Sequence, residues 1–165
     1  MKLSKELNDA LVEQVRLEYE AAWIYNGMRI FLEDLGAVGA TRWMTAQVHE
    51  EFTHAQDFIN FIMDADGEIN QVGGLDATNC DYEGLQDVWE TGLEHEKKIT
   101  RSITDILEMA INEKNYAAEN FLRTYVDEQL EEEDNFRNVI ELIKLAEDDK
   151  GAMFRVDAIL GQRNE

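Results

Sequence analysis

The segment 50–58, EEFTHAQDF, places two adjacent carboxylates and a histidine inside a stretch with helical periodicity. Glu51 and His54 are three residues apart, so on a helix both side chains would lie on one face and could reach the same ligand. A carboxylate paired with an imidazole is a donor set for a divalent transition metal. On an exposed helix face the same pair would be ordinary solvated surface. The rest of the sequence is therefore needed to distinguish a metal site from an exposed polar surface.

Helices must position this pair, and the sequence predicts four long ones. The chain contains no proline, and glycine supplies most of the breaks between segments of 3.6-residue periodicity. We expect long helices over residues 3–35, 40–66, 82–113 and 116–147, and a short one over 152–160. The connection over residues 67–81 is much longer than the others, so the second and third helices should run parallel. The expected fold is all-α: one domain, a four-helix bundle with one long crossover connection and a short fifth C-terminal helix.

Each long helix carries an apolar stripe that is interrupted near its middle by a glutamate. A stripe misplaced by one position would explain a single interruption, but it explains four together with a histidine far less well. Buried carboxylates are costly unless they are paired or bound to metal, so the pattern predicts a shared site. Carboxylates with imidazole and no thiolate suit iron or manganese better than a closed structural zinc site. The four interruptions are Glu18, Glu51, Glu96 and Glu132.

The composition narrows the function classes further. The 165 residues are 44% hydrophobic and 31% charged, with a formal net charge of -21. Such an acidic chain is unsuited to binding nucleic acid through phosphates and favours cations or basic partners. No apolar run is long enough to span a membrane, and no signal peptide is evident, so we expect a cytoplasmic protein. The single cysteine, Cys80, is assigned no role.

Several blocks of the sequence resemble the non-haem ferritins of bacteria and archaea, within the ferritin-like di-iron carboxylate family. The matching blocks are EEFTH, LEHEKKIT, NFLRTYVDEQLEEE and the closing GAMFRVDAILGQR, and together they cover nearly the whole chain. Two features differ from other members of the wider family. Glu128 is followed at i+3 by Glu131 and not by histidine, and Phe52 and Thr53 offer no methionine for an inter-subunit haem, so no haem is expected.

The resemblance implies roles for individual residues. Glu18 and His54 would ligate one iron, Glu51 would bridge both, and Glu96 and Glu132 would hold the second. Tyr25 would lie beside this di-iron centre and donate a hydrogen bond or an electron, and Gln129 would lie just behind the ligands. An outer, third iron site would use Glu50, Glu128 and Glu131. His49 and His95 are expected at the surface or behind the ligands, because each adjoins a proposed ligand and so points roughly 100° away from it.

The resemblance also implies a function: ferroxidase activity, in which Fe(II) is oxidised by dioxygen or hydrogen peroxide, and storage of the product as a mineral. Related subunits form a hollow homo-oligomeric shell of about 24 copies. Two alternatives remain open from the residues alone. One is a rubrerythrin-like di-iron peroxidase on the same bundle, and the other is a non-catalytic acidic helical protein that binds a basic partner.

Overall fold

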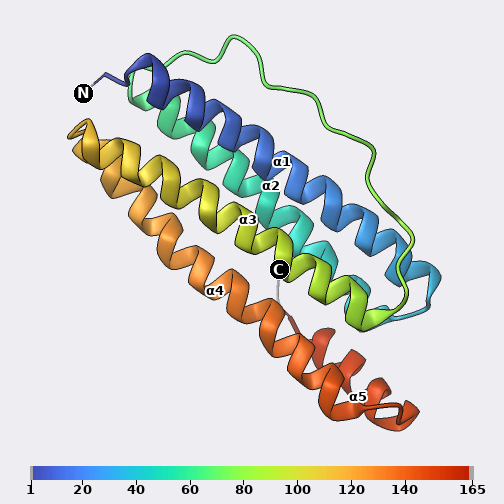
Figure 1. The fold of residues 1–165 in the computed structure, drawn as a ribbon. Helices are drawn as coiled ribbons and strands as arrows, with labels where there is room; N and C mark the ends of the chain where they lie inside the picture. The colour runs from blue at the N-terminus through green and yellow to red at the C-terminus, as the bar shows by residue number, and fades with distance from the viewer. Residues whose placement is uncertain (1, 164–165) are drawn as a thin grey trace.

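The computed structural model describes residues 2–163, which form five helices and no strand: α1 (Lys5–Asp34), α2 (Val38–Asp64), α3 (Leu85–Asn112), α4 (Tyr116–Ala146) and α5 (Lys150–Leu160). The expected all-α bundle with a short fifth helix is therefore confirmed (Figure 1). Across the same residues, no helix combines the length and apolar character that crossing a bilayer requires.

The long connection determines how the helices are paired. α1 and α2 form one antiparallel hairpin, and α3 and α4 form the other. The segment between α2 and α3 runs along the outside of α1 from one end of the bundle to the other (Figure 1). α2 and α3 consequently run parallel, as the length of the connection predicted, and α5 packs against α2 and α4 at one end of the bundle.

The helix boundaries differ from the expected ones by up to three residues, for local reasons. α1 begins at Lys5 and not at residue 3, because the Ser4 side chain accepts a hydrogen bond from the Leu7 N–H and acts as the N-cap. α3 begins at Leu85 and not at residue 82, with Gly84 as its N-cap. α5 begins two residues early at Lys150, because Asp149 caps its N-terminus by accepting from the Ala152 N–H.

The second helix starts two residues before the expected residue 40, so it includes a glycine that was expected to lie outside it. α2 begins at Val38, so Gly39 lies inside the helix. A Cβ built on Gly39 would lie 1.7 Å from the backbone oxygen of Asp157, so only glycine allows α5 to pack this closely. The Asp157 carboxylate accepts hydrogen bonds from the Gly39 and Ala40 N–H groups, at 2.9 and 2.8 Å. These contacts fix α5 to the start of α2.

The core consists of two apolar clusters, one toward each end of the bundle. The cluster nearer α5 contains Tyr25, Trp43, Trp89 and Phe136. The other is built from aliphatic residues together with Phe58 and Tyr125. Glu18, Glu51, Glu96 and Glu132 are buried but belong to neither cluster, so a polar layer separates the two apolar ones.

Candidate metal centre

The four glutamates predicted from the helical stripes all point into the bundle. Each is between 1% and 2% exposed, and each comes from a different long helix. Isolated ionised carboxylates at this depth would cost several kcal/mol apiece. The layer therefore requires either protons or bound cations.

Glu51 takes part in two ligand groups at once. One oxygen of Glu51 lies within 4.8 Å of ligand atoms of Glu18 and His54, and these also lie within 4.8 Å of one another. A second group with the same spacing joins Glu51 to Glu96 and Glu132. Since Glu51 belongs to both, the arrangement can hold two neighbouring metal ions with Glu51 between them.

A third group lies on the outer side of this pair. Ligand atoms of Glu50, His54, Glu128 and Glu132 fall within 4.8 Å of one another, and Glu50 and Glu128 are only partly buried. The resemblance had implied Glu131 here, but Glu131 is exposed and joins none of the ligand groups found among residues 2–163. Glu131 precedes Glu132 on α4 and so points roughly 100° away from it. His54 and Glu132 complete the outer group instead.

Neutral donors orient the buried carboxylates. Gln14 donates to Glu18 at 2.7 Å, and Gln129 donates to Glu96 at 3.0 Å. Gln47 donates from one amide nitrogen to both Glu51 and Glu132, at 2.9 and 2.8 Å. Sequence reasoning had found Gln129 but missed the other two glutamines. The available signal was their position four residues before a buried glutamate on the same stripe.

The pKa values of the buried carboxylates are raised, so these groups keep their protons at a higher pH than exposed carboxylates do. Burial raises the pKa of Glu18 and Glu51 far above the ordinary value, and for Glu51 repulsion from Glu96 and Glu132 adds to the effect. Burial, together with the charge of Glu96, raises the pKa of Glu132 to about 8. Glu18 Oε2 has no hydrogen-bond partner within residues 2–163, which leaves a buried acceptor free for a cation.

Comparison with known proteins identifies the family of this chain. Residues 8–146 match the family described as Ferritin-like domain. The chain belongs to the ferritin family. It is 33% identical over 155 residues to a bacterial non-heme ferritin of Campylobacter jejuni, covering 94% of this chain and 92% of that one. It is 32% identical over 160 residues to a probable bacterial non-heme ferritin-like protein of Haemophilus influenzae, with 96% of each covered.

Solved ferritin structures have the same fold along the whole chain. An open pore ferritin from the archaeon Archaeoglobus fulgidus superposes with a TM-score of 0.96 at 30% identity, covering 99% of this chain and 100% of that one. A structure described as a humanized archaeal ferritin gives a TM-score of 0.96 at 31% identity, with 99% and 98% covered.

Beside the centre of this ferritin-family chain lies a buried tyrosine. Tyr25 is fully buried, and its hydroxyl donates a hydrogen bond to Glu96. Its ring packs against Phe136 at 5.5 Å between centroids and meets His95 edge-on at 5.8 Å. Burial, with the neighbouring charge of Glu96, raises the pKa of Tyr25 well above the ordinary value, so the phenol keeps its proton.

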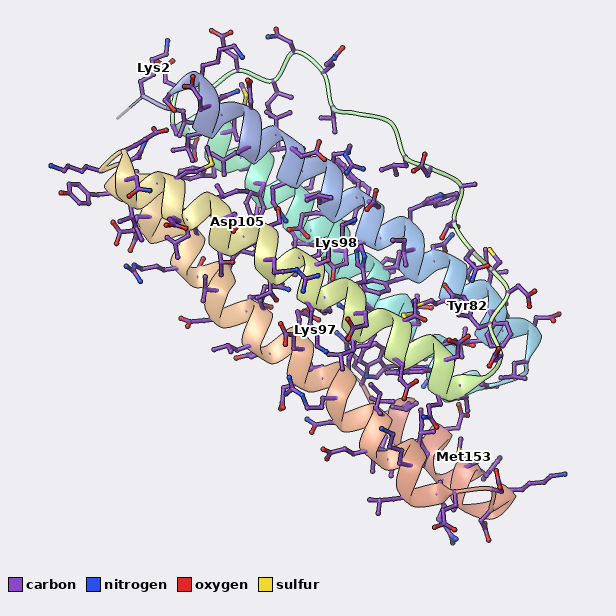
Figure 2. All side chains as sticks on the ribbon, viewed as in Figure 1. Lys2, Tyr82, Lys97, Lys98, Asp105 and Met153 are labelled. Carbon is purple, nitrogen blue, oxygen red and sulfur yellow. The ribbon has the colours of Figure 1, made fainter. Side chains whose placement is uncertain are left out.

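Of the two positions expected for His95, at the surface or behind the ligands, the structure shows the second: the ring is buried against Tyr25. The charges of Lys98 on α3 and Glu20 on α1 both act on the His95 ring, and these two residues form an ion pair with Nζ and Oε1 atoms 3.2 Å apart. Lys98 is labelled on α3 in Figure 2. Burial lowers the pKa of His95 to about 4, so the ring is neutral at physiological pH. His49, by contrast, is exposed as expected.

Proposed function

We propose that this protein is an iron-storage ferritin that oxidises Fe(II) to Fe(III) at a di-iron centre inside each subunit. The observation that carries the proposal is the sharing of Glu51 by two three-residue ligand groups in a buried layer. Paired sites of this kind activate two metal ions together. The family membership and the absence of a thiolate from the donor set support iron as the metal.

In the proposed reaction iron is the substrate, and each ligand has a role. Glu18 and His54 hold one Fe(II), Glu96 and Glu132 hold the other, and Glu51 lies between them. Two Fe(II) ions supply two electrons, and two protons complete the reduction of dioxygen to hydrogen peroxide, or of hydrogen peroxide to water. Carboxylate oxygens are hard donors that favour Fe(III) over Fe(II), so the ligand set itself favours oxidation.

The remaining residues act on these ligands. Tyr25 fixes Glu96 through its hydroxyl hydrogen bond and is the nearest candidate for an additional electron donor. Gln14, Gln47 and Gln129 hold carboxylate oxygens in place without neutralising them. Preorganised ligands of this kind reduce the rearrangement needed when Fe(II) enters.

Storage requires assembly, and the surface of the isolated subunit supports it. Large apolar side chains are exposed near the α5 end of the bundle, among them Val38 at 69%, Leu145 at 81% and Phe154 at 77%. Apolar surface gathered in this way is typical of subunit interfaces. We propose a hollow homo-oligomeric shell of about 24 subunits in the cytoplasm, with Fe(III) mineral inside.

Aerobic loading with an excess of Fe(II) tests the proposal. The wild-type protein should elute as a large shell, oxidise Fe(II) rapidly and retain far more iron than the centre can bind. Glu51→Ala should lose most of the fast phase of Fe(II) oxidation, whereas Glu141→Ala, at an exposed position on α4, is the matched control and should keep it. Retention of only about two irons per subunit would refute storage and favour a di-iron peroxidase. A wild-type protein that does not oxidise Fe(II) would refute the ferroxidase.

A further inference from the structure

Arg163, which follows α5, places a guanidinium group against the metal centre. One of its nitrogens donates to Gln47 Oε1 at 2.8 Å, and another pairs with Glu50 Oε2. The guanidinium carbon also lies 4.3 Å from the centroid of the Trp43 ring. The side chain is only 19% exposed, so three separate contacts hold it in one place.

The contact with Glu50 involves a residue of the outer ligand group. Glu50 is one of the four residues whose ligand atoms converge there, and the Arg163 guanidinium is bonded to one of its two oxygens. The positive charge of Arg163 therefore already neutralises the carboxylate that a third metal ion would need as a ligand. A guanidinium and a metal ion held by the same carboxylate would repel each other strongly at this short range.

Arg163 is also connected to the inner pair through Gln47. Because the Gln47 oxygen accepts from Arg163, its amide nitrogen faces Glu51 and Glu132 and donates to both. A flipped amide would instead direct its oxygen at two carboxylates. The Arg163 contact therefore holds Gln47 in the orientation that suits the inner pair while it occupies the outer group.

We propose that Arg163 is a built-in competitor for the third cation, so that the centre loads two metal ions first and accepts a third only when Arg163 is displaced. This inference rests on the proposed function, because it concerns the same centre. There is room for the displacement: an open pocket of about 880 Å³ is lined in part by His49, Glu50, Glu128 and Arg163. A divalent ion that binds Glu50, His54 and Glu128 would push the guanidinium into this space.

Anaerobic titration with Zn(II) tests the competition, because zinc reports occupancy without being oxidised. Arg163→Gln should tighten the third equivalent about tenfold relative to wild type, with the first two equivalents as the internal reference. Arg155→Gln removes the same charge from an exposed position on α5 and should leave the third equivalent unchanged. In a Glu50→Gln background, Arg163→Gln should have no effect on the third equivalent.

A third equivalent in Arg163→Gln that stays within about twofold of wild type would overturn the inference, and so would a tightening that persists without Glu50. Failure of the proposed function gives a different result. If the wild-type protein does not oxidise Fe(II), the ferroxidase is refuted, while the zinc comparison still reports on Arg163. If it binds no pair of zinc ions at all, both proposals fall.

Discussion

Replacing Glu132 with glutamine should stabilise the metal-free protein at neutral and alkaline pH. Burial, with repulsion from Glu96, raises the pKa of Glu132 from 4.5 to about 8. In the unfolded chain the Glu132 side chain ionises near its ordinary pKa of about 4.5. Burying the protonated side chain therefore carries no cost of protonation only below about pH 4.5. The contribution of Glu132 to stability then falls as the pH rises and is lost completely above about pH 8.

The size of this loss follows from the shift. A difference of about 3.5 pKa units corresponds to a free energy on the order of 5 kcal/mol, accumulated between about pH 4.5 and pH 8. For a chain of this size each kcal/mol moves the melting temperature by about 2–4 °C. Glutamine is neutral at every pH and keeps a similar shape. Metal-free Glu132→Gln should therefore melt roughly 10 °C above wild type near pH 8, and the two should converge near pH 5.

Calorimetric melts of chelator-treated protein between about pH 5 and pH 8.5 measure this difference. Glu141→Gln, on the exposed face of α4, is the matched control and should follow the wild-type curve. A Glu132→Gln curve parallel to wild type across this range would refute the assignment of a protonated, buried Glu132. A melting temperature below wild type at pH 8 would refute it as well.

Three further predictions come from the same contacts. Zn(II) binding at about pH 6.5 should release at least one proton per subunit, because Glu132 with a pKa of about 8 is mostly protonated at that pH. Calorimetry in two buffers of different ionisation enthalpy measures this release, and binding without proton release would contradict the prediction. Gly92→Ala should destabilise the protein by about 1–3 kcal/mol, since its Cβ would lie 2.2 Å from Phe136 Cε1; thermal melts should show no such loss for Gly74→Ala, whose added carbon meets nothing within 4 Å. Glu128→Gln should weaken the third zinc equivalent and Glu131→Gln should not, and the reverse order would restore Glu131 as the outer ligand.

The fold could be predicted from sequence because its determinants are local. Apolar periodicity, the absence of proline and one long connection led to the four-helix bundle, its parallel α2 and α3, and the short α5. Gly39 was misread because its role depends on Asp157, more than a hundred residues away, whose backbone leaves no room for a Cβ. A glycine that permits close helix packing has the same sequence signal as one that ends a helix.

The buried glutamates could be found for the same reason, since each interrupts an apolar stripe of its own helix. The contact of Arg163 with Gln47 could not, because it joins residues 116 positions apart that share no periodic pattern. For His95 the sequence left two positions open, at the surface or behind the ligands, because a helix in a bundle faces two neighbours. His95 and Glu96 can both be buried when adjacent faces of α3 are covered.

The choice of neutral partners explains how the centre can be both buried and ready for metal. Within residues 2–163, none of Glu18, Glu51, Glu96 and Glu132 pairs with a lysine or arginine; amides and a phenol hold them instead. The four negative charges of these carboxylates, which have no permanent counter-ions, match the four positive charges of two Fe(II) ions. When metal is absent, protons neutralise the carboxylates instead. An arginine in this layer would bind the carboxylates tightly and exclude the ions. Arg163 instead contacts Glu50 at the outer edge, where occupation by a cation leaves the inner pair open.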